Sequence, residues 1–289
     1  MSNIRPRRSV LYMPGSNARA LEKARSLPAD ALILDLEDAV APDAKELARE
    51  QVCAAVAARG FGKREIIVRI NALSTAWGEA DLEAAMKVAP DAILVPKISA
   101  AHELHAIDAQ MRGAEKSIAV WAMVETPLAI LNIGPIAAAG GRLSCFVMGT
   151  NDLIKEVRGT HTKDRMNLAA ALGLSVAAAR ANDLAIIDGV FNDIQDSEGF
   201  AAICAQGRSF GFDGKTLIHP TQVEPCNAIF APSPEEVESA RKIIAAFDLP
   251  ENKGKGAIKL DGRMVELLHA EIARRTVALA EAIAELERA

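Results

Sequence analysis

Short apolar runs alternate with longer segments rich in Ala, Leu and Glu over the first 220 residues, and the apolar run recurs eight times. Apolar runs of this length, bounded by turn residues, are typical of buried strands, and the longer segments are typical of helices. Because helical crossovers connect parallel strands, eight such units predict a closed (β/α)₈ barrel, the TIM-barrel fold. The expected strands are Ser9–Met13, Ala31–Leu36, Glu65–Ile70, Ala92–Pro96, Ile118–Val124, Ser144–Met148, Leu184–Ile187 and Asp213–Ile218.

The segments between these runs fit helices in length and composition. A doubly wound open sheet is the competing architecture, but its first turn is usually rich in glycine. Here the first run ends in Pro14-Gly15-Ser16-Asn17, which lacks the Gly-x-Gly-x-x-Gly pattern, so the barrel is preferred. The expected helices are Asn17–Ser26, Ala41–Arg59, Asp81–Val88, Ala100–Met111, Leu128–Ala139, Asn167–Asn182 and Ser197–Phe210.

Beyond residue 230 the sequence changes character. This predicts two domains, a catalytic barrel over residues 1–230 and an appended segment over 231–289. Ser233 and Glu236 form a capping box, which marks the start of a helix. Residues 249–256 follow this helix as a flexible linker with two glycines.

A hairpin and a last helix are expected after the linker. Ala257–Leu260 and Arg263–Val265 flank Asp261-Gly262, a dipeptide that type I′ turns between two strands prefer. The helix runs from about Val265 to Glu287. A hairpin plus helix attached to a complete barrel by such a linker is typical of a lid, over its own mouth or a neighbouring subunit's.

Charged and polar residues gather at the carboxyl ends of the expected strands and are almost absent within them. In a barrel these ends meet at one mouth, where the active sites of this fold lie. The pattern therefore predicts a single site at the mouth. The residues at strand ends are Asp35, Glu37, Asp38, Arg69, Asn71, Lys97, Glu125, Asp152, Asp188 and His219.

Glu125 and Asp152 stand at the ends of two successive apolar runs. A buried, ionised carboxylate needs a partner, because its desolvation is costly. Mg²⁺ prefers oxygen ligands and often uses only one or two protein carboxylates, so the pair predicts a Mg²⁺ site, with Mn²⁺ as a substitute metal. The alternative is that Glu125 caps a loop and Asp152 is the N-cap of the next helix.

Arg69 ends an apolar strand, and its guanidinium would suit a substrate carboxylate or a developing oxyanion. It could instead form a structural salt bridge to an acid of the 35–38 segment. Glu37 and Asp38 are expected to accept hydrogen bonds from metal-bound waters or to pair with Arg69. Lys97 could act as a Schiff-base nucleophile, although the nearby carboxylates favour an ion pair.

Three further residues have both a structural and a functional interpretation. Lys23 lies four residues after Arg19 on the first expected helix, so the two share a face that is either a solvated surface or a binding surface. His219 is either a packed residue at a strand end or a ligand. Asp261 is a turn residue by default, and only its place on an expected lid suggests a further role.

The composition argues against several partners. The chain has 289 residues, 50% hydrophobic and 25% charged, with a net charge of −5. Mild acidity argues against nucleic acid or an anionic membrane as the main partner. The four cysteines lie far apart without a Cys-x-x-Cys pair, so neither a zinc site nor a disulfide framework is expected. No apolar run is long enough to span a bilayer, and a cytoplasmic protein is expected.

Eight short motifs follow one another along almost the whole chain. They are Leu-Tyr-Met-Pro-Gly-Ser (11–16), Leu-Glu-Lys-Ala (21–24), Leu-Asp-Leu-Glu-Asp-Ala-Val (34–40), Val-Arg-Ile-Asn (68–71), Val-Pro-Lys (95–97), Met-Val-Glu-Thr (123–126), Gly-Thr-Asn-Asp-Leu (149–153) and Lys-Thr-Leu-Ile-His-Pro (215–220). In this order they resemble the citrate-lyase-β-like CoA-ester lyases of the HpcH/HpaI aldolase superfamily, which include malyl-CoA and citramalyl-CoA lyases. Residues 149–156 and 260–266 are most similar to the branch that contains malyl-CoA thioesterase. Thr150-Asn151 replaces the Ala-Glu of many members and leaves Asp152 in place.

The resemblance implies roles for individual residues. Glu125 and Asp152 would bind Mg²⁺, and Arg69 would bind the substrate. Asp261 would act as an acid or base in the site of an adjacent subunit, which implies a homo-oligomer, either a trimer or a pair of trimers. The residues implied to meet the CoA ester are Tyr12, Lys23, Ile218 and His219, the last two through their backbone.

The resemblance also implies a reaction. A Mg²⁺-dependent carbon–carbon lyase would cleave malyl-CoA, methylmalyl-CoA or citramalyl-CoA by a retro-Claisen step. The products would be acetyl-CoA or propionyl-CoA and glyoxylate or pyruvate. Hydrolysis of (3S)-malyl-CoA at the same site is the main alternative. A class II pyruvate aldolase, a citrate lyase β subunit and a non-catalytic binding barrel are lesser alternatives.

Overall fold

The computed structural model describes residues 4–288. These residues form two compact units, one over Arg7–Phe230 and one over residues 4–6 and 231–288. The first unit contains the strands β1 to β8, and the second contains a two-stranded hairpin and the helices before and after it. That the second unit works as a lid stays a prediction.

The first unit is a closed barrel of eight parallel strands in sequence order, with β8 paired to β1. The predicted (β/α)₈ fold is confirmed, and each strand starts within one residue of its predicted start. The strands are β1 (Ser9–Pro14), β2 (Ala31–Asp35), β3 (Glu65–Arg69), β4 (Ala92–Val95), β5 (Ala119–Val124), β6 (Leu143–Met148), β7 (Ala185–Asp188) and β8 (Gly214–Leu217).

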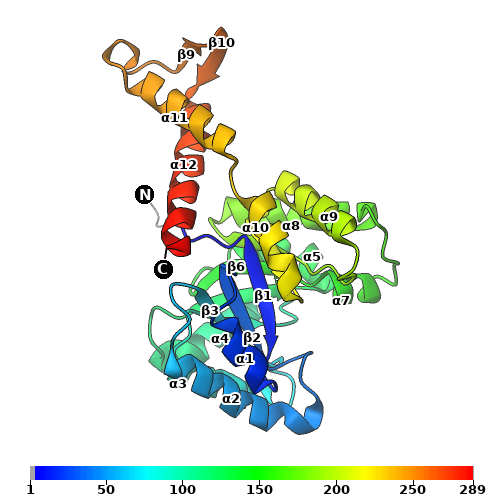
Figure 1. Ribbon diagram of the computed structural model, residues 1–289. Coiled ribbons are helices and arrows are strands. Elements are labelled where there is room, and N and C mark those ends of the chain that lie inside the picture. The colour runs from blue at the N-terminus through cyan, green and yellow to red at the C-terminus, as the bar shows by residue number, and fades with distance from the viewer. Residues whose placement is uncertain (1–3, 289) are drawn as a thin grey trace. The chain divides into compact units, whose positions relative to one another are not determined.

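Helices connect the strands and form the outer layer of the barrel (Figure 1). The segment predicted as one helix over 128–139 is two short helices that meet at Asn132, and Pro135, which cannot donate a backbone hydrogen bond, lies in the second. The sequence patterns also do not predict α7 and α10. The α-helices are α1 (Ala18–Ala24), α2 (Lys45–Ala58), α3 (Gly78–Val88), α4 (Ala101–Gln110), α5 (Pro127–Leu131), α6 (Ile133–Ala137), α7 (Thr150–Glu156), α8 (Ala169–Ala181), α9 (Ser197–Phe210) and α10 (Val223–Phe230). Short 3₁₀ helices are η1 (Pro42–Ala44), η2 (Met111–Gly113), η3 (Met166–Leu168) and η4 (Pro220–Gln222).

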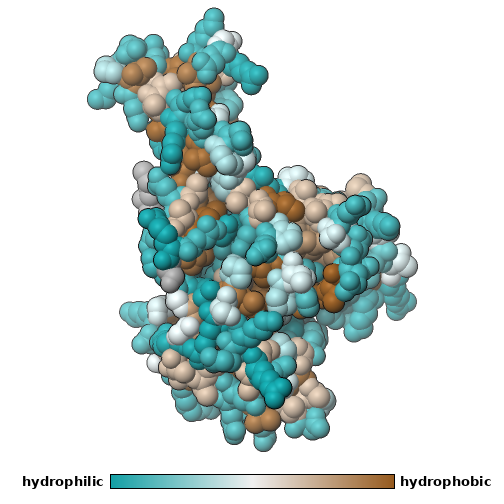
Figure 2. Space-filling model, viewed as in Figure 1, coloured by the Kyte–Doolittle hydropathy of each residue, from teal (hydrophilic) through white to brown (hydrophobic). Residues whose placement is uncertain are grey.

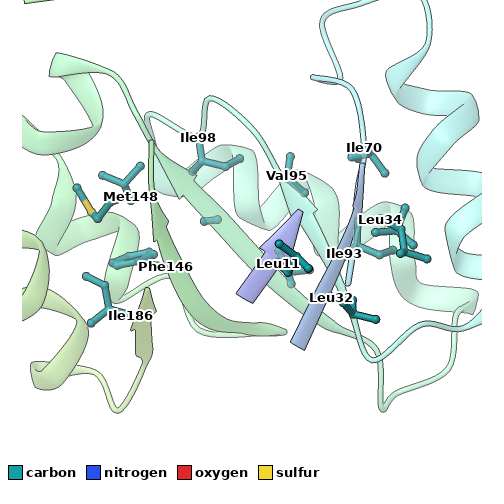
Figure 3. Packing of buried hydrophobic residues seen from close by; sticks show 14 of the residues in the cluster. Leu11, Leu32, Leu34, Ile70, Ile93, Val95, Ile98, Phe146, Met148 and Ile186 are labelled. Atoms are coloured by element: carbon teal, nitrogen blue, oxygen red, sulfur yellow. The ribbon is translucent and has the colours of Figure 1, made fainter. Parts of the chain in front are cut away.

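Alternate side chains of each strand enter two different cores. Odd and even positions point to opposite faces of a strand, so one set fills the barrel and the other packs under the helices. The outer core includes Leu32 and Leu34 of β2, which lie on the same side of their strand in Figure 3. The inner core consists of Val10, Ala31, Ile33, Ile67, Ala92, Leu94, Trp121, Met123, Cys145, Val147 and Ile187.

Large side chains fill the amino-terminal end of the barrel interior. Trp121 is fully buried there, and the Arg7 guanidinium lies 5.2 Å from the centre of its ring. Arg7 is held by an ion pair with Glu65, the first residue of β3, at 2.6 Å. The carboxyl end of the barrel is therefore the end at which polar groups can meet a ligand.

The second unit begins with α11 (Pro234–Asp248), which is followed by η5 (Pro250–Asn252). The predicted capping box is present, because Ser233 Oγ accepts from the Glu236 N–H at 3.2 Å and Glu236 Oε2 accepts from the Ser233 N–H at 2.7 Å. Strands β9 (Ala257–Leu260) and β10 (Arg263–Glu266) pair antiparallel, and α12 (Leu267–Glu287) packs along α11 (Figure 1).

The hairpin turn has the predicted geometry. Asp261 and Gly262 have φ angles of +47° and +80°, and a type I′ turn requires positive φ at both central residues. Apolar side chains are exposed on this unit, as the brown surface in Figure 2 shows; they include Met264, Leu267, Leu268 and Ile272. Among the helices of residues 4–288, none is long and apolar enough to cross a membrane.

Candidate active site at the barrel mouth

Three charged side chains continue the inward-facing positions of the barrel strands. Asp35, Arg69 and Glu125 each lie two residues beyond a member of the inner core, so strand alternation directs them into the mouth. Each is almost fully buried, with 0%, 5% and 1% of its surface exposed. The predicted gathering of charge at the mouth is therefore found for these strands.

Arg69 and Asp35 form a two-pronged ion pair. Arg69 Nη2 lies 2.6 Å from Asp35 Oδ2, and Nε donates to Oδ1 at 2.7 Å. The structural salt bridge that was one interpretation of Arg69 is thus present. The third nitrogen, Nη1, lies 3.9 Å from the sulfur of Met123 and is the one not used by Asp35. It is the nitrogen that faces the other acids of the mouth.

Glu37 and Asp38 share that nitrogen. Arg69 Nη1 lies 2.9 Å from Glu37 Oε2 and 3.2 Å from Asp38 Oδ2. The Asp38 side chain is 65% exposed, whereas that of Glu37 is 10% exposed. Burial raises the pKa of Glu37 to about 8; Arg69 opposes this rise, and Asp38 and Glu125 add to it.

Glu125 is held by the backbone of the preceding loop. The Lys97 N–H donates to Glu125 Oε1 at 2.8 Å, from a backbone with a φ of +59°. On its other side Glu125 packs against Gly149, where an added Cβ would lie 2.4 Å from the Glu125 Cβ. Burial raises the pKa of Glu125 to about 7, and the charge of Asp152 adds to the rise.

Asp152 lies in the first turn of α7, and its side chain is 28% exposed. The N-cap of α7 is Gly149, so the alternative that Asp152 is the N-cap is wrong. The pKa of Glu125 is raised first by burial and then by the charge of Asp152, and a divalent cation would offset both effects. Residues 4–288 contain no group of three or more His, Cys, Asp or Glu side chains that could hold a metal ion. Two carboxylate oxygens completed by water or substrate are a donor set that fits Mg²⁺.

Tyr12 presents a hydroxyl to the same region. Its ring lies 4.8 Å from the Arg69 guanidinium, and its buried hydroxyl has no hydrogen-bond partner among residues 4–288. Burial raises its pKa, so the phenol stays protonated and can donate to a ligand oxygen.

Lys97 is the half-exposed cation of the mouth. Its Nζ lies 3.8 Å from Glu37 Oε1. Burial lowers the pKa of Lys97, but Glu37 and Glu125 outweigh it and the net shift is upward. An ammonium held protonated in this way is a poor nucleophile, so the ion pair is favoured over the Schiff-base interpretation.

Of the residues expected at the mouth, Asp188 lies elsewhere, whereas the predicted CoA contacts Lys23, Ile218 and His219 stay predictions. Asp188 points outward under the helices, where it pairs with Lys215 at 3.0 Å and with Arg165 at 2.8 Å. Lys23 is exposed on α1. His219 is half-buried and its Nδ1 lies 2.7 Å from Thr221 Oγ1, while Ile218 beside it is 42% exposed. Asp261 belongs to the other compact unit.

Sequence reasoning missed Lys45 and Asp81, two buried charged residues behind the mouth. A signal for Lys45 exists. It precedes the buried residues Ala48, Val52 and Val56 of α2 by three, seven and eleven positions, which places it on the buried face of that helix.

Comparisons with known proteins give matches along nearly the whole chain. The chain matches the HpcH/HpaI aldolase/citrate lyase family over residues 8–220, and a family of carbon–carbon bond lyases of the TIM-barrel fold over residues 167–284. It is 52% identical over 279 residues to the (3S)-malyl-CoA thioesterase of Cereibacter sphaeroides, covering 96% of either chain. It is 34% identical over 284 residues to the citrate lyase subunit beta of Escherichia coli, covering 96% of this chain and 94% of that one.

A solved structure shows the same architecture. The protein CitE of Mycobacterium tuberculosis, in complex with magnesium, acetoacetate and coenzyme A, is 30% identical with a TM-score of 0.73. The match covers 94% of this chain and 97% of that one. The barrel carries two carboxylates and an arginine at its mouth, and family models match nearly all of the chain. The chain therefore belongs to the HpcH/HpaI aldolase/citrate lyase family.

Proposed function

We propose that this chain is a Mg²⁺-dependent enzyme acting on CoA esters and that its reaction is the hydrolysis of (3S)-malyl-CoA. The observation that carries the proposal is the 52% identity, along 96% of either chain, to a thioesterase of that specificity. The mouth is consistent with an acidic substrate, because Arg69, Lys97 and the Tyr12 hydroxyl lie beside a pair of carboxylates suited to a cation.

Glu125 and Asp152 would hold the metal in this enzyme. The bound Mg²⁺ would polarise substrate oxygen atoms as a Lewis acid. The magnesium complex of the Mycobacterium tuberculosis relative supports this choice of metal, and Mn²⁺ is proposed as a substitute. Glu37 and Asp38 would accept hydrogen bonds from waters around the site.

The remaining residues would bind and orient the substrate. Arg69 Nη1 would donate to an oxygen on which negative charge develops, in a buried setting where such a contact is strong. The Tyr12 hydroxyl would donate a second hydrogen bond. Lys23 and the backbone of Ile218 and His219 would contact the CoA moiety.

Asp261 would provide the proton transfer. In hydrolysis it would accept a proton from the attacking water and return it to the departing thiolate. We propose that it does so in the site of an adjacent subunit, in a trimer or a pair of trimers. The exposed apolar residues Met264, Leu267, Leu268 and Ile272 on the same unit support an association that covers them. Light scattering after size-exclusion chromatography tests the subunit number.

Carbon–carbon cleavage is the second candidate reaction. It is favoured by the match to carbon–carbon bond lyases and by the likeness to citrate lyase subunit beta. At the same site Asp261 would remove the proton of the substrate hydroxyl, the carbon–carbon bond would break to leave a thioester enolate whose oxygen Arg69 stabilises, and the proton would return to the enolate α-carbon. The products would be acetyl-CoA and glyoxylate from malyl-CoA, or the corresponding pair from methylmalyl-CoA or citramalyl-CoA.

One incubation separates the two reactions. The purified protein is mixed with (3S)-malyl-CoA, with and without Mg²⁺, and free thiol and glyoxylate are measured separately. Free thiol without glyoxylate, dependent on Mg²⁺, is the expected result. Glyoxylate without free thiol would show that the reaction is the lyase reaction and not hydrolysis. If neither product forms, malyl-CoA is rejected as the substrate.

A further inference from the structure

A buried lysine lies directly behind the acidic loop that follows β2. Lys45, the first residue of α2, is 6% exposed. Its Nζ donates to the carbonyl oxygens of Leu36 at 2.8 Å and of Glu37 at 2.7 Å, and to Asn71 Oδ1 at 2.7 Å. All three donors of the ammonium are therefore used, two of them on consecutive backbone carbonyls of one loop.

The position of Lys45 is itself fixed by neighbours. Asn71 Nδ2 donates to Leu36 O at 2.9 Å and to Asp81 Oδ2 at 2.6 Å, and Arg49 Nε donates to Asp81 Oδ1 at 2.6 Å. The Lys45 ammonium also lies 5.4 Å from the ring of Trp77. A buried network in which every member is satisfied holds its groups in one arrangement.

The loop that Lys45 holds carries Glu37 into the mouth. Asp35 also anchors the loop, since it accepts from the N–H groups of Glu37 at 2.9 Å and Ala39 at 3.1 Å. From this backbone the Glu37 carboxylate reaches Arg69 on one oxygen and Lys97 on the other. Removing the ammonium would take one donor from each of two buried loop carbonyls, which keep only Asn71 Nδ2 and the Val40 N–H, and would loosen the loop.

We propose that Lys45 is a positioning residue of the active site, which fixes the Leu36–Glu37 backbone so that the Glu37 carboxylate is held beside Arg69 and Lys97. The inference rests on the proposed function, since Glu37 has a task only if the mouth binds a metal and an acidic substrate. Lys45 touches neither and acts through Glu37.

Whether the loss of Lys45 weakens or strengthens Mg²⁺ binding separates a positioning role from a purely electrostatic one. Loss of a cation near several carboxylates would, by charge alone, strengthen Mg²⁺ binding. Loss of a positioning group would weaken it, because residues that orient the surroundings of a metal typically contribute about 10- to 100-fold to its affinity.

The experiment measures Mg²⁺ affinity by isothermal titration calorimetry on the full chain. The variants are Lys45→Met, Glu37→Gln and the double variant. We expect Lys45→Met to weaken Mg²⁺ binding by about tenfold. In the Glu37→Gln background the same change should alter affinity by less than about twofold, because residues that act through one another are not additive.

Arg142→Met is the matched control. Arg142 also donates to several backbone carbonyls, those of Met111, Ala114, Glu115 and Ile118, but at the amino-terminal side of β5. The Arg142→Met substitution should lower the melting temperature and leave Mg²⁺ affinity unchanged. If Lys45→Met does not fold, Lys45→Gln, which keeps a donor without the charge, takes its place.

Unchanged or tighter Mg²⁺ binding in the Lys45 variant would overturn the proposal, and so would an equal loss in both backgrounds. Absence of Mg²⁺ binding in the unmodified protein would overturn it as well. Mg²⁺ binding with the expected coupling, but without turnover of any CoA ester, would support the role of Lys45 and reject the proposed function.

Discussion

The main-chain N–H of Lys97 donates to the Glu125 carboxylate while Lys97 has a left-handed backbone with a φ of +59°. Residues other than glycine adopt this conformation at a cost of about 1–3 kcal/mol, and it persists where the surroundings enforce it. Here the unusual conformation directs an N–H at a carboxylate proposed to bind metal.

Replacing Lys97 by glycine should therefore cost less stability than replacing it by alanine. Both variants lose the ammonium beside Glu37, but only glycine relieves the backbone strain, so the glycine variant should be more stable by about 1 kcal/mol. Calorimetric unfolding measures the difference. Ala89→Gly, at the left-handed C-cap of α3, should give a similar gain with unchanged activity. Equal stabilities of the two Lys97 variants would contradict the argument.

Glu125→Gln and Asp152→Asn should each abolish Mg²⁺-dependent turnover. Each exchange removes one of two anionic ligands while preserving shape. Calorimetric titration with Mg²⁺ should show no binding in either variant. Glu103→Gln provides the control, because Glu103 caps α4 through the backbone of Ser99 and Ala100. Full activity of either site variant would remove that residue from the metal site.

Mg²⁺ affinity should depend on pH with a break near the pKa of Glu125, about 7. Below that pH the metal must displace a proton, so affinity should fall about tenfold per pH unit, and above it the curve should level off. The metal-free fold has the opposite preference. Because the folded pKa is raised, stability from this group is present in acid and is lost as the pH rises towards 7. Titration calorimetry from acid to mildly basic pH, repeated on Glu37→Gln, tests the break; a curve without one would contradict it.

Asp261→Asn should lower kcat by about 10²- to 10⁴-fold if Asp261 is the acid or base. Asparagine accepts positive φ as readily as aspartate, so the hairpin turn at φ +47° should survive. Steady-state kinetics and a melting curve on one preparation separate the two roles. A kcat close to that of the unmodified protein would leave Asp261 as a turn residue only.

Lys215→Met should destabilise the barrel by about 3–5 kcal/mol, since it leaves the buried Asp188 carboxylate with one ionic partner fewer. Although burial opposes it, Lys215 and Arg165 together hold the pKa of Asp188 below its usual value. The stabilisation is therefore present at neutral pH and is lost as the pH falls through the depressed pKa. Acid unfolding followed by circular dichroism should lose this steep dependence in Asp188→Asn.

Strand alternation explains why so much of the mouth was predictable. Arg69 and Glu125 each follow an apolar strand at an inward position, so periodicity alone places them in the barrel end. The same rule explains an error. Asp188 directly follows Ile187, which is an inner-core residue, so the next side chain points outward to Lys215. The prediction counted polar residues at strand ends without asking whether each side chain points into or out of the barrel. It therefore placed Asp188 in the mouth incorrectly.

Other features of the site depend on tertiary contacts that no local pattern contains. The positive φ of Lys97 follows from the position of Glu125, a residue 28 positions further along the chain. The bonds of Lys45 join a helix start to a loop and to Asn71, 26 positions away. The prediction was also wrong for residues 128–139. The apolar pattern predicts one helix there, but the segment forms two short helices, the second of which contains Pro135.

The filled amino-terminal end of the barrel closes the barrel interior below the mouth. Trp121, with Arg7 against its ring, is fully buried, and Met123 lies one inward position above it beside Arg69. If the proposed acyl acid binds at the mouth, Met123 would meet it from below, and a longer carbon skeleton would have to extend towards the rim. The loops at the rim would then discriminate among acids of equal length.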